Sequence, residues 1–128
     1  HKFTYSLYAH HGTWKEADTM EQALDLNVPA LVLPILLDCE DTAYFSVDEK
    51  NILLDTVKKA EEEEAVIVRL YEYHNRQTVG SLSAKRHIER AFLCNLLEEE
   101  DEELPVIGNC VSINFKPYEI HTIKLYME

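Results

Sequence analysis

Polar and apolar residues alternate from the very start of the chain. Phe3, Tyr5 and Leu7 fall on one face of an extended segment, and this pattern predicts a β-strand over residues 2–8. A strand needs a neighbouring strand or a covered edge. Because this one starts at the first residues, we expect the chain to be part of a larger protein.

A helix-start signal follows this first segment. Thr13 and Glu16 have the spacing of a capping box, in which the Thr side chain caps the helix N-terminus. Apolar residues then recur at helical spacing, at Trp14, Ala17, Met20 and Leu24. The sequence therefore predicts one short α-helix near residues 14–25, which ends close to Pro29.

The remainder of the chain alternates with the period of β-strands. The predicted strands cover residues 30–37, 44–47, 52–57, 65–73, 78–83, 88–97, 110–115 and 120–127. Pro34 removes a backbone donor and puts the first of these at a sheet edge or a bulge. Segments 65–73 and 78–83 are expected to pair as a hairpin. Segment 88–97 also fits a helix, but its neighbours favour a strand.

Roughly eight to ten short strands with one helix are typical of a mainly β protein, an antiparallel β-sandwich. At 128 residues the chain has the commonest size of a single domain, and we expect one domain over residues 1–128. No apolar run approaches the ~20 residues that a membrane-spanning helix needs.

The charge excludes one class of partner. Twelve basic residues face 24 acidic ones, for a net charge of -12, and such a surface repels nucleic-acid phosphates. Two runs, residues 61–64 and 98–103, hold ten of the acids (four and six). Each run predicts a solvated loop between strands. A cation site is the alternative, although neither run has the interleaved Asp/Asn and the Gly of an EF-hand loop.

Cysteine usage bears on compartment. The chain has three cysteines, Cys39, Cys94 and Cys110. Their odd number and wide spacing fit neither a disulfide framework nor a zinc knuckle. They are expected to be reduced fillers of the interior, and on that basis a cytoplasmic location is expected.

Candidate chemistry is sparse. His10 and His11 precede the predicted helix and lack the two further ligands of a zinc site, so ligand binding by one of them and simple backbone capping both stay open. No nucleophile motif is present. Carboxylates within strands, such as Asp55 and Glu72, are most simply explained by cross-strand ion pairs. Trp14 and the tyrosines fit either a sugar-stacking platform or core packing.

Four blocks in a fixed order give a further indication. They are Phe3–Trp14 (FTYSLYAHHGTW), Leu26–Leu31 (LNVPAL), Leu54–Glu61 with Ile67–Glu72 (LDTVKKAE and IVRLYE), and Cys94–Glu99 with Phe115–Ile123 (CNLLEE and FKPYEIHTI). Together they resemble the C-terminal part of glycoside hydrolase family 38, the α-mannosidases. The resemblance runs almost from end to end of the chain.

The resemblance implies a non-catalytic C-terminal β-sandwich domain of a retaining, zinc-dependent α-mannosidase. Zinc and the Asp nucleophile belong to the N-terminal domain of such enzymes, so no cofactor, metal ligand or catalytic residue is expected in this chain, which should be inactive alone. The implied partners are the catalytic and middle domains of the parent enzyme and, through the parent, mannose-containing glycans.

The same resemblance marks candidate residues of a substrate cleft or an interdomain contact. These are His10, Trp14, Arg69 and Glu72, which match the family's blocks without an assigned catalytic role. Ala9 replaces the family's usual Pro before His10. Asn75 stands where the family commonly has Gly, and because Asn tolerates positive φ the turn at this position can still form. Two alternatives remain: a free-standing carbohydrate-binding module, or an interaction domain unrelated to sugar.

Overall fold

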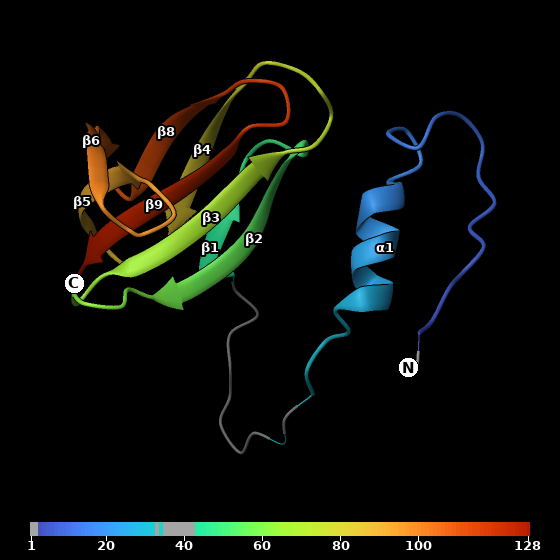
Figure 1. Ribbon diagram of the computed structural model, residues 1–128, viewed down its shortest axis with the longest axis horizontal. Coiled ribbons are helices and arrows are strands. Elements are labelled where there is room, and N and C mark those ends of the chain that lie inside the picture. The colour runs from blue at the N-terminus through green and yellow to red at the C-terminus, as the bar shows by residue number, and fades with distance from the viewer. Residues whose placement is uncertain (1–2, 33, 35–42) are drawn as a thin grey trace. The chain divides into compact units, whose positions relative to one another are not determined.

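The structure is a computed structural model that describes residues 3–32, 34 and 43–128. The chain forms two compact units, His1–Glu40 and Asp41–Glu128. The first unit contains the helix α1 (Thr19–Asn27), and the second contains the strands (Figure 1). The helices of the described residues include none that is long and apolar enough to cross a membrane.

The predicted helix forms, but it begins later than the sequence indicates. The capping-box contacts are present, because the Thr13 amide donates to the Glu16 carboxylate at 2.7 Å and the Glu16 amide lies 3.4 Å from the Thr13 hydroxyl. Asp18 then adopts a left-handed conformation with φ of 50°, which interrupts the helical path. Residues 14–18 therefore form turns, and the helix runs only from Thr19 to Asn27.

The strand predicted over residues 2–8 is wrong for the residues that the structure describes. Residues 3–10 are neither helix nor strand, and the side chains of Phe3, Tyr5 and Leu7 are 83%, 86% and 95% exposed. Alternation of polar and apolar residues gives an extended segment one apolar face, but a stable strand also needs a neighbouring strand to pair with. Residues 30–32 and 34 likewise form no strand, and the rest of the predicted segment 30–37 lies outside the described residues.

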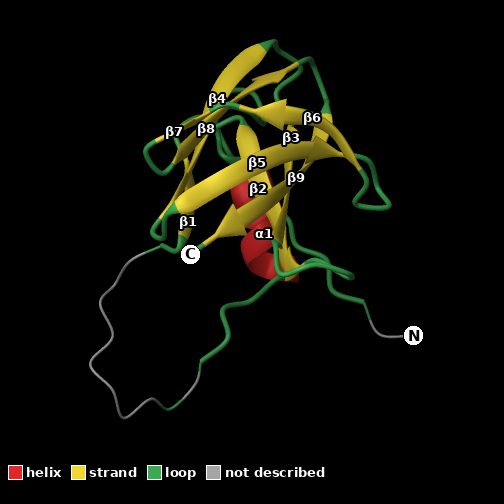
Figure 2. Ribbon diagram, turned by 90° about the vertical axis from the view of Figure 1, so that its left-hand side faces the viewer, coloured by secondary structure: helices red, strands yellow, loops and turns green. Residues whose placement is uncertain are grey.

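The second unit is an antiparallel sandwich of two sheets (Figure 2). One sheet has the order β1-β4-β8-β7 and the other β2-β3-β9-β5-β6. The strands are β1 (Phe45–Val47), β2 (Ile52–Lys59), β3 (Val66–Glu72), β4 (Thr78–Ala84), β5 (Ile88–Cys94), β6 (Glu100–Leu104), β7 (Val106–Ile107), β8 (Cys110–Phe115) and β9 (Ile120–Met127). The predicted mainly β sandwich is confirmed.

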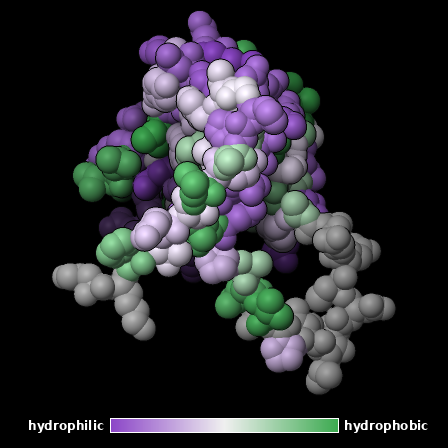
Figure 3. Space-filling model, turned by 90° about the vertical axis from the view of Figure 1, so that its right-hand side faces the viewer, coloured by the Kyte–Doolittle hydropathy of each residue, from purple (hydrophilic) through white to green (hydrophobic). Residues whose placement is uncertain are grey.

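Period-two burial explains why these segments become strands. In β8, Val111, Ile113 and Phe115 are buried while the residues between them are more exposed. Val68 and Leu70 of β3 face the same core from the opposite sheet. Each such side chain contributes about 1.5–3 kcal/mol when it is fully buried. Surface hydrophobics also occur, and on one face they stand among hydrophilic side chains (Figure 3).

The predicted hairpin of segments 65–73 and 78–83 is wrong. β3 pairs with β2 and β9, whereas β4 pairs with β1 and β8 in the other sheet. The loop over residues 73–77 therefore carries the chain from one sheet to the other. Both strands have apolar faces, and these meet across the core instead of lying side by side. Asn75 does take the positive φ expected of it, at 60°.

Two further predictions have mixed outcomes. Segment 88–97 is a strand over Ile88–Cys94, as the neighbouring strands suggested. The acidic run at 98–103 is not wholly a loop, because Glu100–Leu104 pairs with β5 as the edge strand β6. Charged residues are tolerated there since an edge strand exposes its side chains to solvent and acidic side chains discourage pairing with other chains.

Candidate functional site

Three connections between the two sheets converge at one end of the sandwich. They are the β1–β2 turn, the β3–β4 loop and the β8–β9 turn, each of which joins a strand of one sheet to a strand of the other. The last two lie together at one end of the ribbon in Figure 1. We call this region the crossover end, defined by residues 48–51, 73–77 and 116–119.

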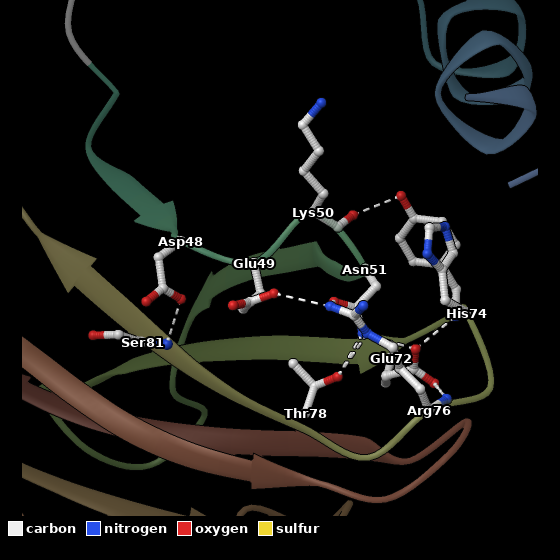
Figure 4. A network of polar contacts seen from close by, with 10 residues as sticks. Asp48, Glu49, Lys50, Asn51, Glu72, His74, Arg76, Thr78 and Ser81 are labelled. Carbon is white, nitrogen blue, oxygen red and sulfur yellow. Dashed lines mark hydrogen bonds and ion pairs between the residues drawn. The ribbon is translucent and has the colours of Figure 1, made fainter. Parts of the chain in front are cut away.

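A buried carboxylate fastens the crossover end (Figure 4). Glu72, the last residue of β3, is 1% exposed. One of its oxygens accepts hydrogen bonds from the Asn51 side-chain amide at 2.9 Å and from the His74 amide at 2.6 Å. The other accepts from the amides of Arg76 at 3.2 Å and Tyr118 at 3.0 Å. Glu72 thus contacts all three connections.

A second layer of contacts fixes the donors themselves. Asn51 is 1% exposed and also donates to the Thr78 hydroxyl at 2.7 Å. The Arg76 guanidinium donates to the Asn51 carbonyl oxygen at 3.0 Å and pairs with Glu49 at 3.1 Å. The side-chain polar atoms of Asn51, Glu72 and Thr78 therefore all have partners, which is the condition under which a buried polar network rigidifies a fold.

Electrostatics favour the ionised form of Glu72. Burial alone would raise its pKa, but hydrogen bonds from the Asn51 side chain and from the backbone amides of Tyr118, His74 and Arg76 outweigh burial and hold the pKa below its ordinary value. The group is a carboxylate at neutral pH. Its four acceptor positions are all occupied, so it cannot accept a proton from a substrate or bind a metal without releasing a loop.

Two of the four non-glycine residues with positive φ in the described part of the chain lie at the crossover end, in the β3–β4 loop and the β8–β9 turn. Asn75 and Tyr118 both have positive φ, at 60° and 58°. For a bulky residue such as Tyr this conformation is unusual and costs about 1–3 kcal/mol. The Tyr118 amide binds Glu72, and its side chain is 58% exposed. The crossover end therefore holds an aromatic ring at the surface in a conformation that Glu72 stabilises.

The two acidic runs form a second polar cluster. Lys58 pairs with Glu61 at 2.6 Å and with Glu98 at 2.7 Å, and so joins the first run to the second. Lys124, 5% exposed, pairs with Glu63 at 2.9 Å. Acidic loops that would repel each other are thus bridged by two lysines.

Tyr126 adds a neutral link to this cluster. Its hydroxyl donates to Glu63 at 2.5 Å or to Glu100 at 2.7 Å. Hydrogen bonding to these two carboxylates raises the pKa of Tyr126. Among the described residues, no group of three or more His, Cys, Asp or Glu side chains is arranged to hold a metal ion. Lysines of the chain itself thus pair with part of the two acidic runs.

The cluster predicts acid sensitivity of a defined sign. Hydrogen bonds from Tyr126 and then Lys124 lower the pKa of Glu63 from 4.5, so the folded state binds its proton less readily than the unfolded state. This contribution is complete above pH 4.5 and is lost as the pH falls through the folded-state pKa. The free energy of unfolding of the chain minus that of Glu63→Gln should be constant from pH 6 to 8 and shrink below pH ~4.5. Urea titrations measure it, and a difference that is independent of pH would contradict the prediction.

Comparison with known proteins identifies the sandwich. The family described as glycosyl hydrolases family 38 C-terminal beta sandwich domain matches residues 51–123. The chain belongs to this family. The match begins at Asn51 and so contains β2 to β8, the first half of β9 and every residue that donates a hydrogen bond to the Glu72 carboxylate.

Curated relatives extend the match beyond the sandwich. The chain is 33% identical to Alpha-mannosidase 2C1 of Mus musculus over 100% of its length, which is 13% of that protein. It is 30% identical to Alpha-mannosidase G of Dictyostelium discoideum over 97% of the chain and 12% of the relative. Alpha-mannosidase of Saccharomyces cerevisiae is 26% identical over 98% of the chain and 14% of the relative. The chain thus spans about an eighth of the relatives' length.

The family 38 sandwich separates the two candidates that lie on β3. Glu72 follows Val68 and Leu70 on the inward face, whereas Arg69 alternates with them on the outward face. The Arg69 side chain donates from Nε to the Thr122 hydroxyl of β9 at 3.3 Å. The structure therefore does not bring these two residues together. The cross-strand ion pair that the sequence suggested for Glu72 is wrong within the described part of the chain, where the donors to its carboxylate are amides.

The other two candidates lie in the first unit. The His10 ring is 5.4 Å from that of Tyr8, and its Nδ1 lies 3.3 Å from the His11 carbonyl oxygen. Trp14 is 40% exposed and has the Lys15 ammonium 5.3 Å from its ring centroid. Their assignment to a cleft or an interdomain contact stays a prediction.

Sequence reasoning missed the partners of Glu72. Asn51 and Tyr118 come from distant segments, 21 and 46 residues from Glu72, and no spacing in the sequence links them to it. Turn-forming residues occur at each of the three connections. They predict where the chain changes direction, but they do not predict that the three connections lie next to one another.

Proposed function

We propose that this chain is the non-catalytic C-terminal sandwich of a retaining, zinc-dependent α-mannosidase that hydrolyses terminal α-mannosides. One observation carries the proposal: the family match over residues 51–123 coincides with relatives that are all named α-mannosidases and that extend far beyond the aligned region. Mannose-containing glycans are then the substrates of the whole enzyme.

Zinc belongs to another part of such an enzyme. The described residues do not fit it, because they contain no suitable cluster of ligands and the buried Glu72 carboxylate is fully engaged by amides. The contribution of this chain is structural.

The crossover end is the part of the sandwich best built for shaping a neighbouring cleft. Its loops are held by Glu72, and it presents the exposed Tyr118 ring on a fixed backbone. Glu72 is then a positioning residue that acts through the loops. We assign His10, Trp14 and Arg69 to contacts with the catalytic or middle domains of the same enzyme or with its cleft.

A cytoplasmic location accompanies this proposal. Cys94, which is buried, and Cys110 are both free cysteines. Burial raises the pKa of the Cys94 thiol, which keeps it protonated and unreactive. Such thiols suit a reducing compartment.

The proposal is tested by activity and metal content measured on one sample. The 128-residue chain, supplied with zinc and then dialysed, should not hydrolyse an aryl α-mannoside and should retain no stoichiometric zinc. In a second arm, this chain replaces the matched region of mouse Alpha-mannosidase 2C1. The chimera should hydrolyse the same substrate, whereas deletion of the region should abolish activity.

Each arm has an outcome that contradicts the proposal. Hydrolysis by the isolated chain with bound zinc would place the chemistry within these residues. A deletion enzyme as active and as stable as the intact relative would show that the sandwich is dispensable. Saturable binding of mannose glycans by the isolated chain, weakened by Trp14→Ala, would favour a carbohydrate-binding module instead.

A further inference from the structure

Part of the outer face of the five-stranded sheet is buried as deeply as the core. Ile67, Lys124 and Phe92 stand side by side across β3, β9 and β5, and they alternate along these strands with core residues such as Val68 and Leu125. They are 1%, 5% and 7% exposed. Since the outer face of an antiparallel sheet usually meets solvent, another segment must cover it here.

The β5–β6 turn, residues 95–99, provides this cover, and we call it the strap. β2 is separated from β5 in the sheet by β3 and β9. Nevertheless, Glu98 of the strap pairs with Lys58 of β2 at 2.7 Å and accepts a hydrogen bond from the Glu61 amide at 3.0 Å. Neighbouring strands are about 4.8 Å apart, so the strap reaches across three strand spacings. It therefore folds over the outer face of the sheet, and the loop between β5 and β6 lies in front of β9 in Figure 1.

The strap is held down by polar contacts. Its apolar side chains, Leu96 and Leu97, are 75% and 79% exposed and do not anchor it. Glu98 holds its far end, in a left-handed conformation with φ of 66° that is unfavourable for a residue of this size. The Asn95 side chain accepts hydrogen bonds from the Leu97 and Glu99 amides at 2.8 Å and 3.1 Å, which keeps the strap in one shape. A hollow of about 580 Å³ is lined by the strap, the β2–β3 turn and β9. The strap is thus a compact piece that rests on charged groups and not on apolar packing.

We propose that the strap is an acid-sensitive lid over the outer face of the five-stranded sheet. The lid is closed while Glu98 is ionised and paired with Lys58. A proton on Glu98 removes its charge, the strap lifts, and Ile67 and Cys94 become accessible while the core between the two sheets stays folded. This lid is independent of the function proposed above, because every group in it belongs to the described part of the sandwich.

The sign of the pH dependence follows from the charges around Glu98. The hydrogen bond from the Lys58 ammonium, and then that from the Glu61 amide, hold the pKa of Glu98 below its ordinary value of 4.5. The closed strap therefore binds this proton less readily than the open one. Closure is fully favoured above pH 4.5 and weakens as the pH falls through the lowered pKa. Other titratable groups that face the strap are Glu61 and Glu63 of the β2–β3 turn, Lys124 and Tyr126 of β9, Glu100 of β6 and Cys94 of β5.

Opening is measured as thiol accessibility in the 128-residue chain. Cys94 directly precedes the strap and pairs with Thr122 on the outer face, where it is 7% exposed. Cys110 lies in the other sheet and serves as the internal reference, because acid slows the reaction of both thiols. The reagent is a dithiodipyridine, whose disulfide exchanges with a thiol and releases thiopyridone, and peptide mass spectrometry reads each site. Labelling of Cys94 relative to Cys110 should rise about fivefold between pH ~7 and pH ~4, as expected for the loss of a partly exposed ion pair, with no change in far-UV circular dichroism.

Two variants separate the lid from general acid sensitivity. Glu98→Gln keeps the side-chain shape without the charge, so Cys94 should be labelled about fivefold faster than in the unchanged chain at pH ~7 and should gain little more in acid. Glu62→Gln is the matched control, because Glu62 lines the same hollow and makes no ion pair among the described residues. It should respond to pH as the unchanged chain does.

Three outcomes would overturn the lid. They are Cys94 labelling that rises only when the circular dichroism signal is lost, Glu98→Gln that matches the unchanged chain at both pH values, and Glu62→Gln that opens as far as Glu98→Gln. Each of them leaves the proposed function untouched, since neither activity nor the parent enzyme enters the measurement.

Discussion

Replacing Glu72 by Gln should destabilise the sandwich by about 2–5 kcal/mol. Gln keeps the shape but offers one carbonyl oxygen in place of two carboxylate oxygens. That oxygen can serve one pair of donors. The amides of the other pair, either His74 with Asn51 or Arg76 with Tyr118, would then face an NH₂ group. Buried donors left without an acceptor cost about 1–3 kcal/mol each.

The measurement must report on the sandwich itself. Trp14, the single tryptophan, lies in the first unit, so the probe must instead follow the strands of the second unit. Urea unfolding followed by far-UV circular dichroism is suitable. Glu89→Gln is the matched control, because Glu89 is exposed on β5 and the same change there should alter stability by no more than about 0.5 kcal/mol.

Amide hydrogen exchange separates loop fastening from general destabilisation. In Glu72→Gln the amides of His74, Arg76 and Tyr118 should lose protection by more than the core amides of β3 and β9 lose. Equal losses throughout, or a stability equal to that of Glu89→Gln, would mean that the carboxylate does not hold the crossover end together.

The strands that sequence reasoning located correctly are those in which alternation coincides with burial. Val111, Ile113 and Phe115 alternate because one side of β8 faces the core and the other faces away. Residues 3–8 show the same alternation and form no strand. A periodic pattern therefore reports that a segment has two unlike faces. It does not report that a pairing partner exists.

Sheet pairing is the level at which the sequence was least informative. Segments 65–73 and 78–83 look like a hairpin because a short polar loop joins two β-rich runs. The structure instead sends them to different sheets, since both bury an apolar face and a sandwich needs such faces on opposite sides of the core. Length and composition of the loop do not distinguish these outcomes.

The candidate site was predictable in part. Glu72 was marked by its place in a block resembling the family, but its role follows only from the fold. A carboxylate at the end of a buried strand meets three connections because the strand order brings β2, β3 and β9 side by side in one sheet. Asn51 and Tyr118 then reach it from 21 and 46 residues away. No local pattern contains that information.

Lys124→Met should lower the free energy of unfolding by about 1–3 kcal/mol. Burial disfavours the charged form of Lys124, but the hydrogen bond and the charge of Glu63 outweigh it, and the pKa of Lys124 is raised. Met fills the same space without the charge. Glu63 and Glu100 would then converge on Tyr126 with no neighbouring cation, so the two carboxylates would repel each other. The loss is smaller than for a fully buried pair, since both carboxylates remain partly exposed.

The control decides whether burial or distance sets the strength of these ion pairs. Lys59 lies 2.5 Å from Glu64, closer than Lys124 lies to Glu63 at 2.9 Å. The Lys59 pair is exposed, however, at 64% and 91%, whereas the Lys124 side chain is 6% exposed. Exposed pairs contribute about 0–1 kcal/mol, so Lys59→Met should be nearly neutral in spite of its shorter contact.

A double-mutant cycle completes the test. Lys124→Met combined with Glu63→Gln should cost less than the sum of the single changes, because removing Glu63 relieves the repulsion that loss of Lys124 exposes. Urea midpoints by circular dichroism supply all four free energies. If the changes are additive, or if Lys59→Met costs as much as Lys124→Met, the buried lysine is not what holds the two acidic runs together. Such results would mean that solvent exposure does not determine how much each ion pair contributes to stability, although Lys59 is exposed and Lys124 is buried.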